Sequence, residues 1–452
     1  MTTAKEQEYG AAAPRKRNVG AEPLGTRSGA GALRGTVSFW GGFGLGNFGN
    51  EATLQAMLDS LRRFSPGVYV NCICTDPLVT SANYNIDCVP MNGTLARIGI
   101  PHNRAARLLR SIVVGIPNEV YRWVQAFAAL QGTKLLIVPG TGLLTDAYGI
   151  RSWGPYSIFK WVLLAKLRGC KVLFVSVGAG PLHSRISRWL VRQTLHLADF
   201  RSYRDDETKT YLMGIGAPVT RDRVFPDLAF SIAHDVEGSQ EAPKRIRPLV
   251  GLGLMLYRRE LSSDFSGTST YASYLEQLVV FVEWLLRRDY DIRLLIGELS
   301  DRSVVAEFKT LLKNRLAGYD EGRILDDPVV SVEGLLAQIA GTDFVVATRY
   351  HNVLLALALG KPAISISFHQ KCTSLMKDME LLQYCQDIRD LDAQRLIEQF
   401  CQLEKNAGSV KRMIGERVSR CREQLEEQYE MIFAGDTPKI VRESQEMTNG
   451  SN

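Results

Sequence analysis

Arg349, Tyr350 and His351 stand together where an apolar strand pattern, "FVVAT", gives way to an apolar helix pattern, "NVLLALALG". A guanidinium can hold a phosphate or a carboxylate through two parallel hydrogen bonds. A histidine at a helix N-terminus favours its neutral form and can exchange a proton near neutral pH. This order of residue types predicts an anion-binding site with a proton-transfer group. The alternative interpretation is a capping histidine next to a surface arginine.

Two further polar clusters follow strand patterns. Arg204 lies in "RSYRDDET", directly before Asp205 and Asp206, which suit the first turn of a helix. Gln370 and Lys371 follow His369 in "SFHQKC", after the strand pattern "KPAISIS". We expect Arg204, Gln370 and Lys371 to contact a substrate. A structural ion pair between Arg204 and its neighbouring aspartates, and a solvated loop at 367–371, remain the alternatives.

Glycine-rich turns end three strand patterns, and such turns let backbone amides approach an anion or a sugar. The candidate binding residues are Gly44 and Asn47 in "WGGFGLGNFGNEA", Gly140, Thr141, Gly142 and Asp146 in "VPGTGLLTD", and Gly178 and Gly180 in "SVGAGPL". Asn50 is expected to cap the helix that follows the first turn. Gly44, Gly46 and Gly49 also fit the G-x-G-x-x-G pattern, which is weak evidence by itself. The alternatives are a tight turn that needs a positive φ for the first segment and a turn with a helix cap for the second.

No metal or cofactor motif stands out. The sequence lacks H-E-x-x-H, paired Cys/His ligand spacing, a phosphate-binding G-x-x-x-x-G-K-[ST] loop and a G-x-S-x-G elbow. We therefore expect neither a metal site nor a bound cofactor. None of the eight cysteines forms a C-x-x-C pair, and we expect all of them to be reduced thiols.

Short apolar runs alternate with helical patterns twice along the chain, which is typical of parallel sheets covered by helices. The predicted fold is α/β, with two Rossmann-like, doubly wound domains facing a cleft in a GT-B-like arrangement. Ligands then bind beyond the carboxyl ends of the strands. The predicted divisions are a disordered arm at 1–34, an N-terminal acceptor-side domain at 35–222, a linker at 223–247, a C-terminal donor-side domain at 248–390, C-terminal helices at 391–435 and a flexible tail at 436–452.

The composition of the chain limits the kinds of molecule that the protein is expected to bind. The chain has 452 residues, 45% of them hydrophobic, and a net charge of +6. This mild excess suits an anionic small substrate or an anionic surface, and it is far from the basic stripe of a nucleic-acid-binding protein. No apolar window is long enough for a membrane span, and the N-terminal segment lacks the apolar core of a signal peptide. We expect a cytoplasmic protein, with peripheral contact at the inner face of the membrane as a further option and the oligomeric state open.

The ordered set of motifs resembles the polysaccharide pyruvyl transferase family. The matching segments, from about residue 37 to 385, are "GNFGNEA", "VPGTGLL", "VSVGAGPL", "SYRDDET", "FPDLAF", "TRYHNVLLALALGKPAISIS", "HQK" and "SLM". The resemblance implies a GT-B-like fold, phosphoenolpyruvate as co-substrate, and a sugar or lipid-linked saccharide as acceptor. It also ties Arg349, Tyr350, His351 and Arg204 to donor binding. Asn50 stands where the family often has aspartate, and Pro139 and Thr141 interrupt a glycine run, so the resemblance leaves the identity of the acceptor open.

The resulting hypothesis assigns catalysis to His351 and Arg349. His351 would protonate the methylene carbon of the enol, after which sugar hydroxyls attack and phosphate leaves, forming a pyruvate ketal of a cell-surface polysaccharide or its precursor. One alternative is a GT-B-type nucleotide-sugar glycosyltransferase. The basic segment "SFHQKC" disfavours it, because such enzymes often hold ribose there with an acidic residue. The other alternative is a non-catalytic sugar-binding protein on the same fold.

Overall fold

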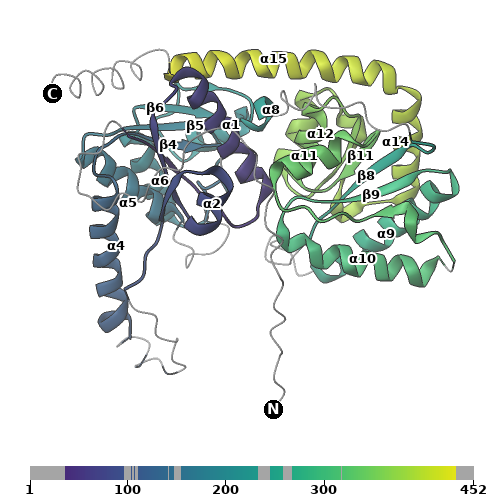
Figure 1. The fold of residues 1–452 in the computed structure, drawn as a ribbon, viewed down its shortest axis with the longest axis horizontal. Helices are drawn as coiled ribbons and strands as arrows, with labels where there is room; N and C mark the ends of the chain where they lie inside the picture. Colours follow the sequence, from purple (N-terminus) through teal and green to yellow (C-terminus); the bar gives the residue numbers. More distant parts are fainter. Residues whose placement is uncertain are drawn as a thin grey trace. The chain divides into compact units, whose positions relative to one another are not determined.

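The computed structural model describes residues 36–95, 103, 106, 110–140, 142–146, 154–232, 245–257, 267–316 and 318–433. The predicted arm at 1–34, the predicted tail at 436–452, the binding candidate Thr141 and most of the expected linker lie outside these residues. The described chain forms two parallel sheets covered by helices, which confirms the predicted α/β fold class (Figure 1).

The first sheet has seven parallel strands in the order β3-β2-β1-β4-β5-β6-β7. The strands are β1 Thr36–Trp40, β2 Tyr69–Cys74, β3 Asp87–Pro90, β4 Thr133–Pro139, β5 Lys171–Val177, β6 Phe200–Tyr203 and β7 Arg223–Val224. The strand order reverses between β1 and β4. In a sheet of this kind, ligands bind outside the carboxyl ends of the strands near that reversal.

Helices cover both faces of this sheet. They are α1 Phe48–Phe64, α2 Pro77–Tyr84, α4 Ile116–Ala129, α5 Gly154–Leu167, α6 Arg185–Leu197, α7 Asp206–Gly214 and α8 Ala229–Ile232, with a π-helical turn, η1 Ser111–Gly115, before α4. Alternate strand residues enter two separate cores. Phe39 and Ile137 join the core on the α1 side, while Trp40 and Val138 join the core beneath α4 to α6.

The second sheet has six parallel strands in the order β10-β9-β8-β11-β12-β13. They are β8 Leu249–Leu254, β9 Asp291–Ile296, β10 Ile324–Leu325, β11 Phe344–Ala347, β12 Ala363–Ser367 and β13 Cys385–Asp387. The helices of this half are α9 Gly267–Arg287, α10 Arg302–Arg315, α11 Val332–Ala340, α12 Tyr350–Ala358 and α13 Gln370–Asp378. Short 3₁₀ turns are η5 Leu299–Asp301, η6 Glu321–Arg323, η7 Leu382–Tyr384 and η8 Ile388–Asp390.

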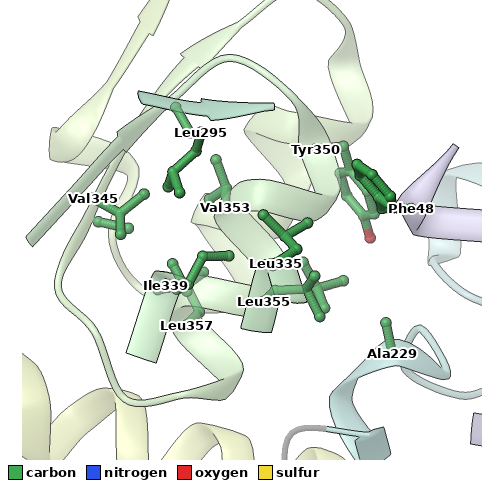
Figure 2. Packing of buried hydrophobic residues seen from close by; sticks show 14 of the residues in the cluster. Phe48, Ala229, Leu295, Leu335, Ile339, Val345, Tyr350, Val353, Leu355 and Leu357 are labelled. Atoms are coloured by element: carbon green, nitrogen blue, oxygen red, sulfur yellow. The ribbon is translucent and has the colours of Figure 1, made fainter. Parts of the chain in front are cut away.

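Helix α12 lies in the centre of the second half. All of its residues except His351 are buried, and Val353, Leu355 and Leu357 belong to one apolar cluster with Leu295 of β9 and Val345 of β11 (Figure 2). A helix that is apolar on every side belongs in a protein core. The same apolar cluster includes Phe48 of α1 and Ala229 of α8, so α12 contributes to the core that both sheets share.

Two helices end the described chain, α14 Ala393–Lys405 and α15 Ala407–Phe433, as the helical C-terminal pattern predicted. Helix α15 contacts both halves: it packs on α12, and Gln428 bonds to Ser176 and Ser202 of the first sheet. No helix among the described residues is long and apolar enough to cross a membrane.

The structure adds short elements that the sequence patterns did not indicate. Strands β3, β7, β10 and β13 have two to four residues each and lie toward the sheet edges, where too few residues are available to form a recognisable pattern. The expected linker at 223–247 contains β7 and α8. The expected cap of α1 was wrong: Asn47, rather than Asn50, accepts hydrogen bonds from the Gly49 and Asn50 amides. Asn50 donates instead to the Gly42 carbonyl.

Candidate functional site

Side chains from both sheets converge on the ring of Tyr350, the first residue of α12. Arg204 follows β6, and its Cζ lies 5.3 Å from the ring centroid. Lys371 is in the first turn of α13, and its Nζ lies 5.4 Å from the same centroid. Cations attracted to an aromatic face gain more when they are removed from water. The structure therefore places two of the predicted cationic residues at one point, each at the carboxyl-end side of its strand.

His351 lies beside this pair, edge-on to Tyr350 at 4.9 Å between ring centroids. Burial and the nearby cations Lys371, Arg204 and Arg349 hold the pKa of His351 well below its usual value. The imidazole is therefore neutral at pH 7, as the sequence predicted for a histidine at a helix start. Burial, reinforced by Arg204, also lowers the pKa of Lys371 to about 8.

Asp227 completes the cluster, and sequence reasoning assigned it no role. Its carboxylate is buried, with Oδ2 3.7 Å from Arg204 Nη1 and 3.9 Å from His351 Nε2, while Oδ1 accepts a hydrogen bond from the Ala229 amide. Burial raises the pKa of this carboxyl. The signal in the sequence was an aspartate between a short strand and α8, in the segment "FPDLAF".

Three polar atoms of the cluster are buried without a well-formed hydrogen bond to a described residue: Asp227 Oδ2, His351 Nε2, and Arg204 Nε, which lies 3.4 Å from Asp205 Oδ2 in an ion pair. Buried polar groups are almost always hydrogen-bonded, and leaving one without a partner costs about 1–3 kcal/mol. Three such atoms around one tyrosine mark a place where a polar ligand would gain several hydrogen bonds. We define Arg204, Asp227, Tyr350, His351 and Lys371 as the Tyr350 cluster.

Arg349 points to a different partner. Its Nε and Nη2 donate to the two oxygens of Asp301 at 2.9 and 2.6 Å, and Nη2 also lies 3.0 Å from Glu298. Asp301 is fully buried and accepts further hydrogen bonds from the Leu256 and Glu298 amides. Arg349 thus ties the start of α12 to the segment after β9. Contact between Arg349 and a donor remains a prediction.

Two glycines make room for the Tyr350 cluster. A Cβ on Gly49 would lie 1.8 Å from His351 Nδ1, and a Cβ on Gly178 would lie 2.6 Å from Arg204 Nη2. Both distances are shorter than a Cβ atom can approach another heavy atom to which it is not bonded. Of this pair, only Gly178 was among the candidate residues. The space that these glycines leave open is part of the site in both cases.

Other candidates have structural partners. Gly44 and Gly180 have φ values of +84° and +87°, which favour glycine, so the turn interpretation holds for them. Gly140 approaches Thr53 and Leu228, while a Cβ on Gly142 would meet no described atom within 4 Å. Asn47 is a helix cap.

The polar candidates Asp146 and Gln370 are also engaged within the protein. Asp146 is buried and accepts hydrogen bonds from the Ser184 and His183 amides, which outweigh burial and lower the pKa of its carboxyl. Gln370 Nε2 donates to Glu207 Oε1 at 3.3 Å, which links α13 to α7 at the protein surface. The structure therefore does not bring Asp146 into the Tyr350 cluster, and it places Gln370 next to Lys371 with its amide turned to Glu207.

Comparison with models of known families shows the family to which the chain belongs. The model of the polysaccharide pyruvyl transferase family matches residues 47–370, which include every member of the Tyr350 cluster except Lys371. The chain belongs to the polysaccharide pyruvyl transferase family. No curated protein matches this polysaccharide pyruvyl transferase family member.

Solved structures show the same fold at low identity. UDP-GlcNAc 2-epimerase from Methanocaldococcus jannaschii is 12% identical, with a TM-score of 0.52 over 81% of this chain and 91% of its own. UDP-GlcNAc 2-epimerase from Neisseria meningitidis, bound to UDP-GlcNAc, is 12% identical, with a TM-score of 0.52 over 87% and 99%. Sucrose-phosphate synthase from Thermosynechococcus elongatus is 14% identical, with a TM-score of 0.51 over 89% and 100%. These likenesses establish the GT-B-like fold of this family member.

The described part of the chain contains no candidate metal site. Among those residues, no group of three or more His, Cys, Asp or Glu side chains is arranged to hold a metal ion. All eight cysteines lie within the described residues, and none of them forms a disulfide there. The chemical groups available at the Tyr350 cluster are therefore two cations, a neutral imidazole, a buried carboxyl and a phenol.

We predict that Gly49→Ala displaces the imidazole of His351, because the new Cβ occupies the position of Nδ1. Gly415→Ala in α15 is the matched control, since a Cβ there meets nothing within 4 Å. Helical Gly→Ala changes normally stabilise by up to about 1 kcal/mol. NMR titration of the His351 ring should give a pKa well below 6.5 in the wild type and in Gly415→Ala, and a pKa closer to 6.5 in Gly49→Ala. An unchanged His351 titration in Gly49→Ala would contradict this packing.

Proposed function

We propose that this protein transfers the pyruvyl group of phosphoenolpyruvate to two hydroxyls of a sugar, forming a pyruvate ketal on a cell-surface polysaccharide or its precursor. The observation that carries the proposal is the pair of partly buried cations, Arg204 and Lys371, beside a neutral imidazole. Phosphoenolpyruvate has a phosphate and a carboxylate on neighbouring atoms. Two cations on one aromatic ring, drawn from the two halves of the fold, suit such a compact double anion.

The chemistry is balanced without an added oxidant or reductant. One sugar hydroxyl adds to C2 of the enol while a proton reaches C3, so that the methylene group becomes a methyl group. A second hydroxyl then displaces phosphate from C2 and closes the ketal. One hydroxyl proton ends on the new methyl group, and the other leaves with the phosphate. The protein needs to hold the anion and to move one proton to carbon.

His351 and Asp227 are the groups that we assign to proton movement. In the free protein His351 is neutral, and its Nε2 lies 3.9 Å from a carboxyl whose pKa is raised. A bound phosphate offsets the positive charge of Arg204 and Lys371, so it raises the pKa of His351 and favours the imidazolium. The imidazolium of His351 can then deliver its proton to C3, and the resulting neutral ring takes up the proton of the attacking sugar hydroxyl, with Asp227 beside it to stabilise the charged form.

Arg349 acts as a positioning residue in this proposal. Its two hydrogen bonds to Asp301 fix the N-terminus of α12, from which Tyr350 and His351 project. Binding a donor directly would require Arg349 to give up part of this ion pair, which is costly for a buried carboxylate. Arg204 and Lys371 are therefore the donor-binding cations that we favour.

The free thiols support the proposed cytoplasmic location, because reducing compartments keep cysteines unpaired. A nucleotide-sugar transferase remains the rival function, since the solved neighbours include proteins bound to UDP-GlcNAc. At 12% identity this likeness concerns the fold alone.

The deciding experiment incubates the purified protein with phosphoenolpyruvate and a panel of p-nitrophenyl glycosides and lipid-linked saccharides. We expect phosphate release together with an acceptor mass gain that corresponds to one pyruvate ketal. Parallel reactions contain UDP-sugars in place of phosphoenolpyruvate. Turnover only in those reactions would refute the proposed donor and establish the rival function.

We predict that His351→Ala lowers turnover by about 10²–10⁴-fold, the usual contribution of a positioned general acid or base. His196→Ala, at an exposed position of α6, is the matched control and should keep full turnover. Calorimetry with phosphoenolpyruvate separates proton transfer from charge binding. Affinity for the donor should change little in His351→Ala, and a turnover close to the wild type would rule out His351 as the proton carrier.

The pKa of Lys371 predicts a limit on the alkaline side of the pH profile. Lys371 binds the donor as a cation, and in the free protein it loses this charge as the pH rises through about 8. The value of kcat/KM for phosphoenolpyruvate should therefore fall above about pH 8. In Lys371→Arg the guanidinium remains charged throughout this range, so the decline should move to higher pH. A decline that stays at the same pH in Lys371→Arg would exclude Lys371 as its cause.

A further inference from the structure

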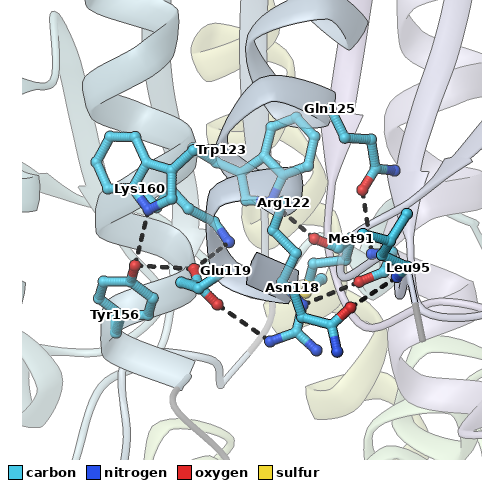
Figure 3. A network of polar contacts seen from close by, with 11 residues as sticks. Met91, Leu95, Asn118, Glu119, Arg122, Trp123, Gln125, Tyr156 and Lys160 are labelled. Atoms are coloured by element: carbon cyan, nitrogen blue, oxygen red, sulfur yellow. Dashed lines mark hydrogen bonds and ion pairs between the residues drawn. The ribbon is translucent and has the colours of Figure 1, made fainter. Parts of the chain in front are cut away.

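Helix α4 has its polar side chains on the inside. Asn118 Oδ1 accepts a hydrogen bond from the Leu95 amide at 2.7 Å, and Arg122 Nε donates to the Gly93 carbonyl at 2.9 Å. Gln125 Oε1 accepts from the Gly93 amide at 3.1 Å. Figure 3 shows these side chains turned toward the loop after β3 and toward α5.

Charged groups complete this inner contact. Glu119 accepts hydrogen bonds from Tyr156 at 2.8 Å and from Lys160 at 3.1 Å, and Lys160 is 1% exposed (Figure 3). Trp123 Nε1 donates to the same Tyr156 hydroxyl. The face of α4 that the protein covers is therefore held largely by hydrogen bonds and ion pairs, although helices normally bury an apolar stripe.

The outer face is apolar instead. Ile116, Val120 and Val124 are 58%, 59% and 63% exposed. With the preceding turn η1 they form a stripe at helical spacing, which we call the α4 stripe: Ile112, Val113, Ile116, Val120, Tyr121, Val124 and Phe127. No charged residue between 111 and 128 is exposed. A contiguous apolar stripe on a helix whose polar side is already satisfied needs an apolar environment outside the protein.

The charge of the neighbouring sequence indicates that environment. From residue 88 to residue 145 the sequence contains six basic residues and one acidic residue, a net charge of +5, and Arg97, Arg104 and Arg107 among them lie outside the described residues. The acidic residue is Glu119, which is paired inward with Lys160 and Arg122. A second copy of this chain carries the same excess of positive charge in this segment of its sequence, so it offers no opposite charge. An anionic lipid surface complements both the apolar stripe and the positive charge.

We propose that the α4 stripe binds the surface of an anionic lipid bilayer, with the helix lying in the interface and the protein above it. The inward polar network allows this, because α4 can present the apolar side chains of its outer face to lipid and remain attached to the first sheet. The inference goes beyond the proposed reaction, and lipid binding can be measured without donor or acceptor. For a lipid-linked acceptor, such docking would bring the enzyme to the surface where its substrate is held.

The test is co-sedimentation of the full chain with vesicles of phosphatidylcholine alone or of phosphatidylcholine with phosphatidylglycerol. We expect binding to the anionic vesicles that weakens at high salt. Val120→Asp with Val124→Asp should lower the partition coefficient at least about tenfold, the equivalent of ~1.4 kcal/mol. Ile246→Asp with Val330→Asp is the matched control, since these exposed apolar residues lie elsewhere and the change adds the same charge.

Several results would overturn the proposal. The proposal fails if the wild-type protein does not bind anionic vesicles. It also fails if the Val120→Asp, Val124→Asp variant binds them as strongly as the wild type does. Light scattering that shows a dimer dissociating in this variant, without vesicle binding by the wild type, would assign the α4 stripe to a second copy. A large fall in melting temperature in this variant alone would show that the chain itself covers the α4 stripe.

Discussion

Two cations held largely out of water, next to one fully buried carboxylate, set the character of the Tyr350 cluster. Removing charged groups from water is costly unless partners compensate for the lost hydration. Here the compensation is partial: Asp227 lies 3.7 Å from Arg204, Asp205 lies 3.4 Å from it, and the ring of Tyr350 attracts both cations. Burial, reinforced by the remaining positive charge, keeps His351 neutral and lowers the pKa of Lys371. An anion bound at this point would relieve the imbalance, so affinity for an anion follows from how the cluster is built.

The fold produces this arrangement in two ways: the cluster residues follow the carboxyl ends of strands, and glycines leave room for their side chains. Arg204 follows β6 in one sheet, while Tyr350 follows β11 and Lys371 follows β12 in the other. The halves meet closely where Phe48 donates its amide hydrogen to the Gly297 carbonyl at 3.1 Å. Gly49 and Gly178 then leave the space into which His351 and Arg204 fit. Arg349 holds the segment after β9 through Asp301, which fixes the N-terminus of α12. Charge, packing and backbone geometry are thus coupled at one place.

The sequence predicted two α/β units with parallel sheets and a helical C-terminal segment, because the apolar periodicity of long elements does not depend on the details of packing. It also predicted that Arg204, Tyr350, His351 and Lys371 would follow strands, and the structure brings these side chains together. It could not indicate that Arg349 bonds to Asp301, a residue 48 positions earlier in another element. Asp227 was missed for a similar reason, since its importance comes from neighbours that are distant in sequence. The cap of α1 was misplaced because Asn47 and Asn50 are both capable of capping and only backbone geometry distinguishes them.

Helix α4 shows what a periodic pattern leaves undetermined. Its sequence predicts an amphipathic helix, and periodicity alone implies that the apolar side faces the core. The decision depends instead on what each face meets. Inside, the carbonyl and amide of Gly93, the Leu95 amide and the hydroxyl of Tyr156 offer hydrogen-bonding partners, so the polar side is satisfied there. These partners come from the loop after β3 and from α5, and none is visible in the helix sequence itself. A buried apolar face would have left those backbone groups without partners, so the inner polar contact explains why the apolar side faces outward.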